Sequence, residues 1–199
     1  PCIARVYDAG ATDDGRPYFV MEYVDGPPIT AYCDQERLDL RQRLELFCEV
    51  CSAVSHAHQK GIIHRDLKPN NVLVATIDGK PVPKVIDFGI AKATDERQGE
   101  HTQVTSERQL LGTPEYMSPE QASGARGVDT RTDVYSLGVV LYRLLAGISP
   151  FDKARLKAAS IPELQRIIRE DTADRPSTRI GELRNDLARA AADRGVGID

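Results

Sequence analysis

The chain contains no apolar run long enough to cross a membrane. Its most apolar stretch, residues 137–145, is interrupted by Arg143 and is far shorter than the roughly 20 residues that a membrane-spanning helix needs. We also recognise no signal peptide. We therefore expect a cytoplasmic setting, which would also suit a longer parent protein that is tethered to a membrane with this part in the cytoplasm.

Cysteine is scarce too, and the four cysteines of the 199 residues predict no disulfide framework. Cys48 and Cys51 have the C-x-x-C spacing, but they lie in a helical pattern and no second pair accompanies them. We interpret both as core or surface positions of a helix rather than as metal ligands or a redox site.

A large net charge is also absent, since the formal charge is −4 at pH 7. So small a charge gives no indication of a nucleic-acid partner or of binding to an anionic membrane surface. The content of 41% hydrophobic and 28% charged residues is ordinary for a soluble globular protein, and 199 residues suit a single domain.

What the chain does contain is a short stretch with the groups that phosphoryl transfer needs. Residues 64–71 read H-R-D-L-K-P-N-N. Asp66 supplies a carboxylate that can orient a hydroxyl and take its proton, Lys68 a cation that offsets phosphate charge, and Asn71 an amide oxygen for Mg²⁺. The spacing from Asp66 to Asn71 is that of H-R-D-L-x-x-x-N, the catalytic-loop signature of protein kinases.

A second motif follows at a matching distance. Asp87 opens a D-F-G triplet, whose aspartate is the main Mg²⁺ ligand in kinases. Two short apolar strands, 72–74 and 82–86, lie between the motifs, and the Asp-Gly pair at 78–79 predicts a turn between them. Such a hairpin would bring Asp87 back beside Asn71, so that both metal ligands face one Mg²⁺-ATP.

A third motif, G-T-P-E-Y-M-S-P-E at residues 112–120, resembles the segment that ends in A-P-E, with Ser118 where alanine is usual. With three motifs in this order, residues 3–170 resemble eukaryotic-type serine/threonine protein kinases, and the sequence of residues 117–121 resembles bacterial members most. The resemblance implies an α+β fold of two lobes, with a partial N-lobe sheet and a mainly helical C-lobe.

The resemblance also implies a division of the chain. Residues 1–24 would be a remnant of the N-lobe with the hinge, and within them we expect two strands, 3–7 and 17–24, with a turn at 13–15. Residues 25–178 would be the C-lobe, and residues 179–199 a C-terminal helix and tail. We find neither G-x-G-x-x-G-x-V nor a V-A-x-K strand, which clamp the phosphates in kinases. We therefore expect a fragment that is inactive alone and that lacks the first N-lobe strands and the C-terminal helices.

The cofactors implied are ATP and Mg²⁺. Kinases bind adenine through backbone groups of the hinge. By position, Met21 would lie at the entrance to the back pocket. The carbonyl of Glu22 and the amide and carbonyl of Val24 would contact adenine. Leu73 and Asp87 would complete the ATP site, and Asp87 with Asn71 would hold the metal.

The resemblance assigns further roles around the catalytic loop. Thr113 would bridge Asp66 and Lys68 as a fourth member of the catalytic set. Asp133, in the apolar helix at 133–147, would accept hydrogen bonds from the catalytic-loop backbone. His58, in the amphipathic helix at 38–59, is interpreted as a hydrogen-bonded core histidine, and His64 as a packing residue behind the D-F-G phenylalanine.

Two interpretations stay open. The polar segment 93–111 corresponds to the activation loop, where Thr105 or Ser106 could be phosphorylated and pair with Arg65, or the loop could simply be solvated. The Glu of the third motif, Glu120, would pair with Arg175 or with a cation beyond the end of the chain. A helix is predicted at 161–170 and another from 179.

Three functions are compatible with these patterns. The first is a protein kinase that transfers the ATP γ-phosphate to Ser or Thr hydroxyls of protein substrates. The alternative is a non-catalytic kinase-like binding module. A small-molecule phosphotransferase would usually carry H-G-D and lack Lys68. Because Pro28, Asn70 and Arg143 are not acidic, we expect only a weak preference for arginine before the phosphoacceptor.

Overall fold

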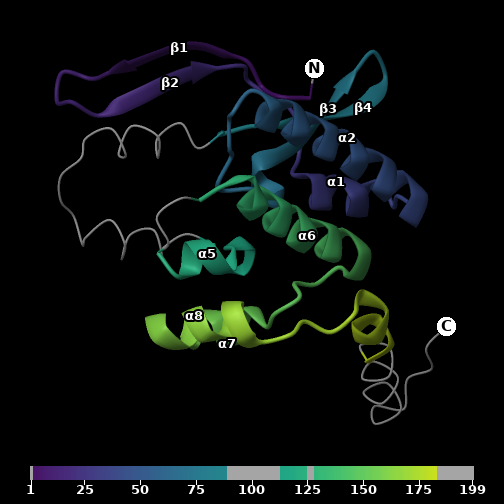
Figure 1. Cartoon of the computed structure of the whole chain (residues 1–199). Coiled ribbons are helices and arrows are strands. Elements are labelled where there is room, and N and C mark those ends of the chain that lie inside the picture. Colours follow the sequence, from purple (N-terminus) through teal and green to yellow (C-terminus); the bar gives the residue numbers. More distant parts are fainter. Residues whose placement is uncertain (1, 89–112, 125–127, 183–199) are drawn as a thin grey trace.

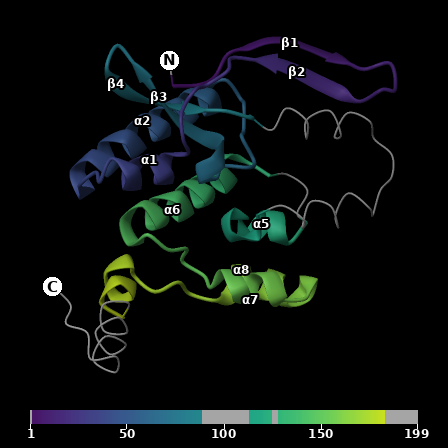
Figure 2. The same cartoon turned by 180° about the vertical axis from the view of Figure 1, so that it is seen from behind.

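The computed structural model describes residues 2–88, 113–124 and 128–182. Two antiparallel hairpins lie at one end of the molecule and helices make up the rest, as both views of the cartoon show (Figure 1, Figure 2). This arrangement agrees with the predicted α+β class. In the described residues, no helix is both long and apolar enough to span a membrane.

The first hairpin consists of β1 (Val6–Ala11) and β2 (Pro17–Met21). Its strands lie largely exposed on both faces, with Tyr7 at 64% exposure. The predicted first strand, from Ile3, was placed too early. A register shift between Val6 and Asp8 interrupts the pairing, and Ile3 instead forms a parallel bridge with Val85.

The second hairpin consists of β3 (Val72–Ile77) and β4 (Lys80–Val85) and confirms the prediction. Asp78 and Gly79 form its two-residue turn with φ angles of 50° and 73°, the positive values that such tight hairpin turns require. Val72 pairs with Val85 at the open end. The hairpin therefore returns the chain to the point where it left the catalytic loop.

Three helices form the centre of the molecule: α1 (Ile29–Gln35), α2 (Leu40–Gln59) and α6 (Thr130–Ala146). Asp39 begins α2 with a capping box, and Gly147 ends α6 in the left-handed conformation. The last two helices agree with those predicted from the apolar patterns, whereas α1 was not predicted.

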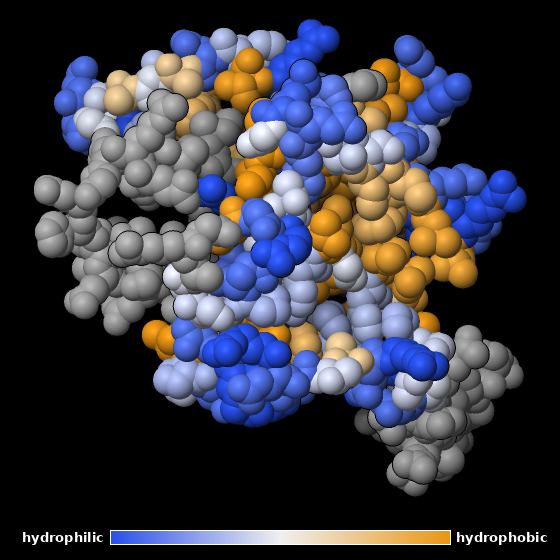
Figure 3. Space-filling view, in the orientation of Figure 1, coloured by the Kyte–Doolittle hydropathy of each residue, from blue (hydrophilic) through white to orange (hydrophobic). Residues whose placement is uncertain are grey.

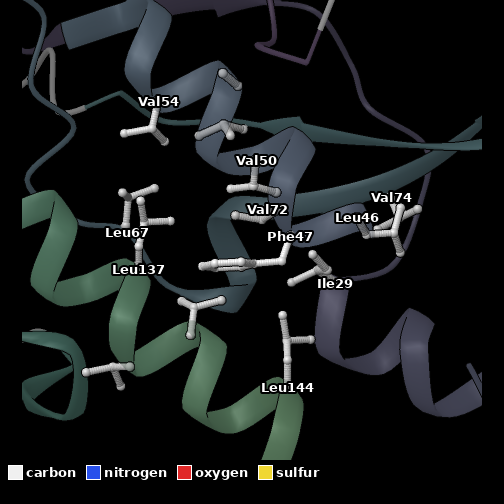
Figure 4. Packing of buried hydrophobic residues seen from close by; sticks show 14 of the residues in the cluster. Ile29, Leu46, Phe47, Val50, Val54, Leu67, Val72, Val74, Leu137 and Leu144 are labelled. Atoms are coloured by element: carbon white, nitrogen blue, oxygen red, sulfur yellow. The ribbon is translucent and has the colours of Figure 1, made fainter. Parts of the chain in front are cut away.

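The main core packs around α2, which contacts both β4 and α6 (Figure 4). Phe47 and Val50 point from α2 toward this core, and Leu137 faces them from α6. Leu67 of the catalytic loop is 1% exposed and Val72 is fully buried. The catalytic loop is thereby fixed to the core at Leu67, between Asp66 and Lys68, and at Val72, directly after Asn71, because burying such side chains stabilises by about 1.5–3 kcal/mol each.

A smaller core joins three short helices. These are α5 (Pro119–Ala122), α7 (Lys153–Ala158) and α8 (Ile161–Glu170), and the last confirms the helix predicted at 161–170. Its buried members are Ala122, Leu156, Leu164, Ile167 and Ile168. A further helical segment, at 176–182, includes the described part of the helix predicted from 179.

The outer face of α2 carries apolar side chains, including exposed Leu40 and Leu44 (Figure 3). Further along the same helix lies an apolar groove of about 820 Å³ between α2 and residues 2–6. Of the two described members of the D-F-G motif, Phe88 lines this groove and Asp87 does not.

One glycine has a specific packing role. The Val74 amide donates to the Pro27 carbonyl at 2.9 Å, which holds the segment after the hinge against β3. A Cβ atom on Gly26 would lie 2.0 Å from the Val74 carbonyl oxygen. Only glycine therefore allows this approach of two backbones.

We expect Gly26→Ala to lower the free energy of unfolding by about 1–3 kcal/mol, because the backbone must move apart. Gly138→Ala is the matched control, since a Cβ there meets nothing within 4 Å and alanine in a helix interior should stabilise by up to about 1 kcal/mol. Urea unfolding of the chain measures both changes. Equal effects of the two substitutions would contradict this account.

Candidate active site

The structure brings the three predicted catalytic-loop residues into direct contact. Lys68 Nζ lies 2.8 Å from Asp66 Oδ2. Asn71 Nδ2 donates to the Asp66 carbonyl at 2.8 Å and to Asp66 Oδ2 at 3.3 Å. The turn is made by η1 (Pro69–Asn71), a 3₁₀ helix that begins with proline. A carboxylate, an ammonium and an amide thus share one small site.

The Asp66 carboxylate is placed to accept a proton. Its side chain is 42% exposed, and the hydrogen bonds that its carboxylate accepts from Lys68 and Asn71 both go to Oδ2. Within the described residues, Oδ1 therefore accepts no hydrogen bond and faces no competitor for an incoming hydroxyl. A general base needs such an accessible oxygen within hydrogen-bond distance of its substrate.

Asp133 fixes the backbone just before the catalytic aspartate. Its carboxylate, which is fully buried, accepts from the His64 and Arg65 amides at 2.8 Å each and lies 2.7 Å from His58 Nε2. Arg65 has a φ of 68°, an unusual value for a residue with a side chain. The predictions for Asp133 and for His58 are therefore both confirmed.

His64 links the catalytic loop to the strand that carries the D-F-G motif. Its Nδ1 accepts from the Asp66 amide at 3.3 Å, so Nε2 is the protonated nitrogen and donates to the Ile86 carbonyl at 2.9 Å. The ring lies 4.7 Å from that of Phe88, centroid to centroid, which confirms the predicted packing. Burial lowers the pKa of His64 below its ordinary value of 6.5.

We expect acid to destabilise the fold through His64. Below pH 6.5 the unfolded chain takes up a proton at this residue that the folded chain refuses. Stability is therefore lost as the pH falls from 6.5 toward the lowered pKa, by at most about 1.4 kcal/mol per pH unit. Between pH 7.5 and pH 5.5, the free energy of unfolding measured with urea should fall less for His64→Gln than for His56→Gln, a control at an exposed position. A pKa of 6.5 or above for His64 in an NMR titration would contradict the prediction.

The two predicted metal ligands lie at adjoining points of the backbone. The Ile86 amide donates to the Asn71 carbonyl at 3.0 Å, and Asp87 follows directly with a φ of 55°. Asn71 uses its Nδ2 for Asp66, which leaves its side-chain oxygen for another partner. One carboxylate and one amide oxygen suit Mg²⁺, which prefers oxygen ligands and keeps several waters or phosphate oxygens.

The described part of the chain has no group of three or more His, Cys, Asp or Glu side chains placed to hold a metal ion. The donor set is thus of the kind that relies on ligands from a bound phosphate rather than an all-protein cage.

The hinge residues follow β2 directly. Met21 ends β2, and Val24 is buried. The Glu22 amide donates to the Arg5 carbonyl at 2.8 Å, whereas in the described residues the Glu22 carbonyl and both backbone groups of Val24 make no hydrogen bond. Those three groups are the ones that the prediction assigns to adenine. Leu73 lies in β3 opposite Pro28.

Sequence reasoning missed one interaction that holds the hinge. Lys84 Nζ lies 2.8 Å from Glu22 Oε1, and the Arg5 amide donates to Glu22 Oε2 at 3.1 Å. The hydrogen bond from Lys84 is the main reason why the pKa of Glu22 is lowered. No alternation in β4 could have indicated that Lys84 points inward, because Pro83, Lys84 and Val85 are all buried.

Thr113 lies on the same small cavity as Lys68, but no hydrogen bond among the described residues joins it to Lys68 or Asp66. Its bridging role stays a prediction. Glu120 accepts from Thr132 Oγ1 at 2.7 Å, and the described residues show no ion pair between Glu120 and Arg175. The candidate phosphosites, Thr105 and Ser106, lie outside the described residues.

Comparison with known proteins agrees with this geometry. The family profile described as protein kinase domain matches residues 1–190. The chain is 44% identical over 157 residues to serine/threonine-protein kinase Pkn1 of Myxococcus xanthus, covering 78% of this chain and 22% of the relative. It is 43% identical over 155 residues to PknB of Mycobacterium leprae, covering 76% and 24%.

A third relative, serine/threonine-protein kinase pkn3 of Myxococcus xanthus, is 40% identical over 182 residues, which cover 90% of this chain and 33% of the relative. The chain thus spans between 22% and 33% of the length of these three relatives.

Proposed function

Because the chain belongs to the protein kinase family, we propose that it carries the catalytic centre of a serine/threonine protein kinase. The reaction is transfer of the γ-phosphate of ATP to a Ser or Thr hydroxyl of a protein. The observation that carries this proposal is the contact of Lys68 Nζ with the Asp66 carboxylate at 2.8 Å, with Asn71 bonded to the same aspartate.

Each residue has a role that its position supports. Asp66 orients the acceptor hydroxyl through its open oxygen and takes the proton as the oxygen attacks phosphorus. Lys68, held beside Asp66, stabilises negative charge on the transferring group. Thr113, which lines the same cavity as Lys68, would complete this set as a bridge between Asp66 and Lys68.

The residues present also fit the cofactors. Asn71 and Asp87 would hold Mg²⁺, which neutralises charge on the ATP phosphates when bound. The backbone groups of Glu22 and Val24 would take adenine, with Met21 and Leu73 lining its pocket. A cytoplasmic location would supply both ATP and Mg²⁺.

The test is phosphate transfer by the protein encoded by the complete reading frame, next to the chain of residues 1–199. With Mg²⁺-ATP and a protein acceptor we expect phosphoserine or phosphothreonine whose formation depends on Asp66. Transfer by neither protein, or transfer that does not need Asp66, would overturn the proposal. A chain that binds partners without any transfer would instead support a non-catalytic module.

A further inference from the structure

We propose that a cavity beside the catalytic loop selects protein substrates with an acidic side chain close to the phosphoacceptor. This inference rests on the proposed function, because it names the substrate class of that site. The cavity has a volume of about 140 Å³ and is enclosed by α1, the catalytic loop, η2 (Pro114–Tyr116), α6 and α7.

The position of the cavity places it next to a bound substrate. Lys68 lines it and also contacts Asp66 at 2.8 Å. A peptide whose hydroxyl reaches Asp66 therefore has its neighbouring residues at the mouth of the cavity. The volume is several times the roughly 30 Å³ that one water molecule occupies in the liquid. It can therefore admit a carboxylate together with water.

Among the described residues, one carboxylate lines the cavity, and it already has partners. Glu115, whose side chain is 3% exposed, lies 3.1 Å from Lys153 Nζ and 3.7 Å from Arg143 Nη1. It also accepts from Ser149 Oγ at 2.9 Å. A basic substrate side chain would have to displace these partners from a buried group, which is costly.

The cations that line the cavity are not all balanced by carboxylates. In the part of the chain that the structure describes, Lys153 and Arg143 face the single carboxylate of Glu115, so one positive charge is in excess, while Lys68 is balanced by Asp66. The Lys153 side chain is 55% exposed, and its ammonium has three donors.

The Arg143 guanidinium has five donors, of which Nη1 contacts the Tyr116 hydroxyl at 3.0 Å. Its side chain is 34% exposed. An entering Asp or Glu would gain charge-assisted hydrogen bonds from both cations, with the Thr30 hydroxyl and the Asn70 amide on the same wall.

The experiment measures peptide binding, which does not depend on transfer. Fluorescein-labelled acceptor peptides carry Asp or Lys at one position at a time, from four residues before the Ser to four after it. Fluorescence anisotropy with the chain should give about 5–10-fold tighter binding for Asp at one or two adjacent positions, and salt should weaken this difference.

Substitutions of residues that line the cavity test whether the preference for Asp comes from it. Lys153→Gln should reduce the Asp preference to less than about twofold. Lys157→Gln, the same change at an exposed position of the same helix that does not line the cavity, should leave it unchanged. Arg143→Met keeps most of the apolar stem and should also reduce it. Thermal melting of each variant shows that the fold persists.

Two outcomes would overturn the inference: no position that favours Asp, or equal preferences in Lys153→Gln and Lys157→Gln. Transfer activity is scored separately, with the same peptides and the protein encoded by the complete reading frame. Asp66-dependent transfer without acid preference would contradict this inference alone, whereas acid-selective binding without such transfer would contradict the proposed function alone.

Discussion

Replacing Asp66 by asparagine is expected to lower the rate of phosphate transfer by about 10²–10⁴-fold, the usual contribution of a general base. The amide that replaces the carboxylate cannot take a proton. It also carries no negative charge to pair with Lys68 Nζ, which in the unaltered protein lies 2.8 Å from Asp66 Oδ2. Affinity for ATP should change little, because Asp66 lies outside the proposed metal and adenine contacts. Initial rates of the protein encoded by the complete reading frame, with Mg²⁺-ATP and a protein acceptor, measure the effect.

Asp13→Asn is the matched control, since it makes the same chemical change at an exposed position between β1 and β2. It should leave the rate within about twofold, because surface substitutions usually alter stability by no more than about 0.5 kcal/mol. The Asp66 variant should also fold normally, given that its side chain is 42% exposed. A rate within tenfold of the unaltered protein would refute the role of Asp66 as base.

The parts of the fold that the sequence predicted are those that local pattern determines. The hairpin around Asp78 and Gly79 follows from a turn pair between two apolar runs. The helices α2 and α6 follow from apolar periodicity and their end signals. The catalytic trio lies within six residues, so its spacing alone brings Asp66, Lys68 and Asn71 together.

The parts that escaped prediction depend on contacts distant in the sequence. The pair of Glu22 and Lys84 joins residues 62 positions apart and depends on how the hinge crosses β3 and β4. The burial of Glu115 between Lys153 and Arg143 depends on how η2 meets α6 and α7. Neither set has a local pattern that marks it.

Short elements were also difficult to predict. Helix α1 has seven residues, of which only Ile29 and Cys33 are buried, so its apolar signal is brief. The start of β1 was misplaced because Ile3 and Val6 look equally suitable for a strand, whereas a bulge and the bridge to Val85 decide between them. Pairing partners, not residue preference, determine such boundaries.

The same distinction explains the second large effect, at Asp133. This residue is 67 positions from Asp66 and touches no substrate, yet it holds the backbone from which Asp66 projects. Replacement by alanine would leave the His64 and Arg65 amides and His58 without their present acceptor in a buried place. Each unsatisfied group costs about 1–3 kcal/mol, and relaxation of the loop recovers part of this.

We expect Asp133→Ala to lower the free energy of unfolding by about 3–5 kcal/mol, as measured by urea denaturation. Asp129→Ala is the control at the start of the same helix, where loss of an exposed cap costs about 0.5–2 kcal/mol. If Asp133→Ala cost no more than this control, the buried hydrogen bonds would contribute little net stability. The catalytic loop would then depend on burial of Leu67 and Val72 instead.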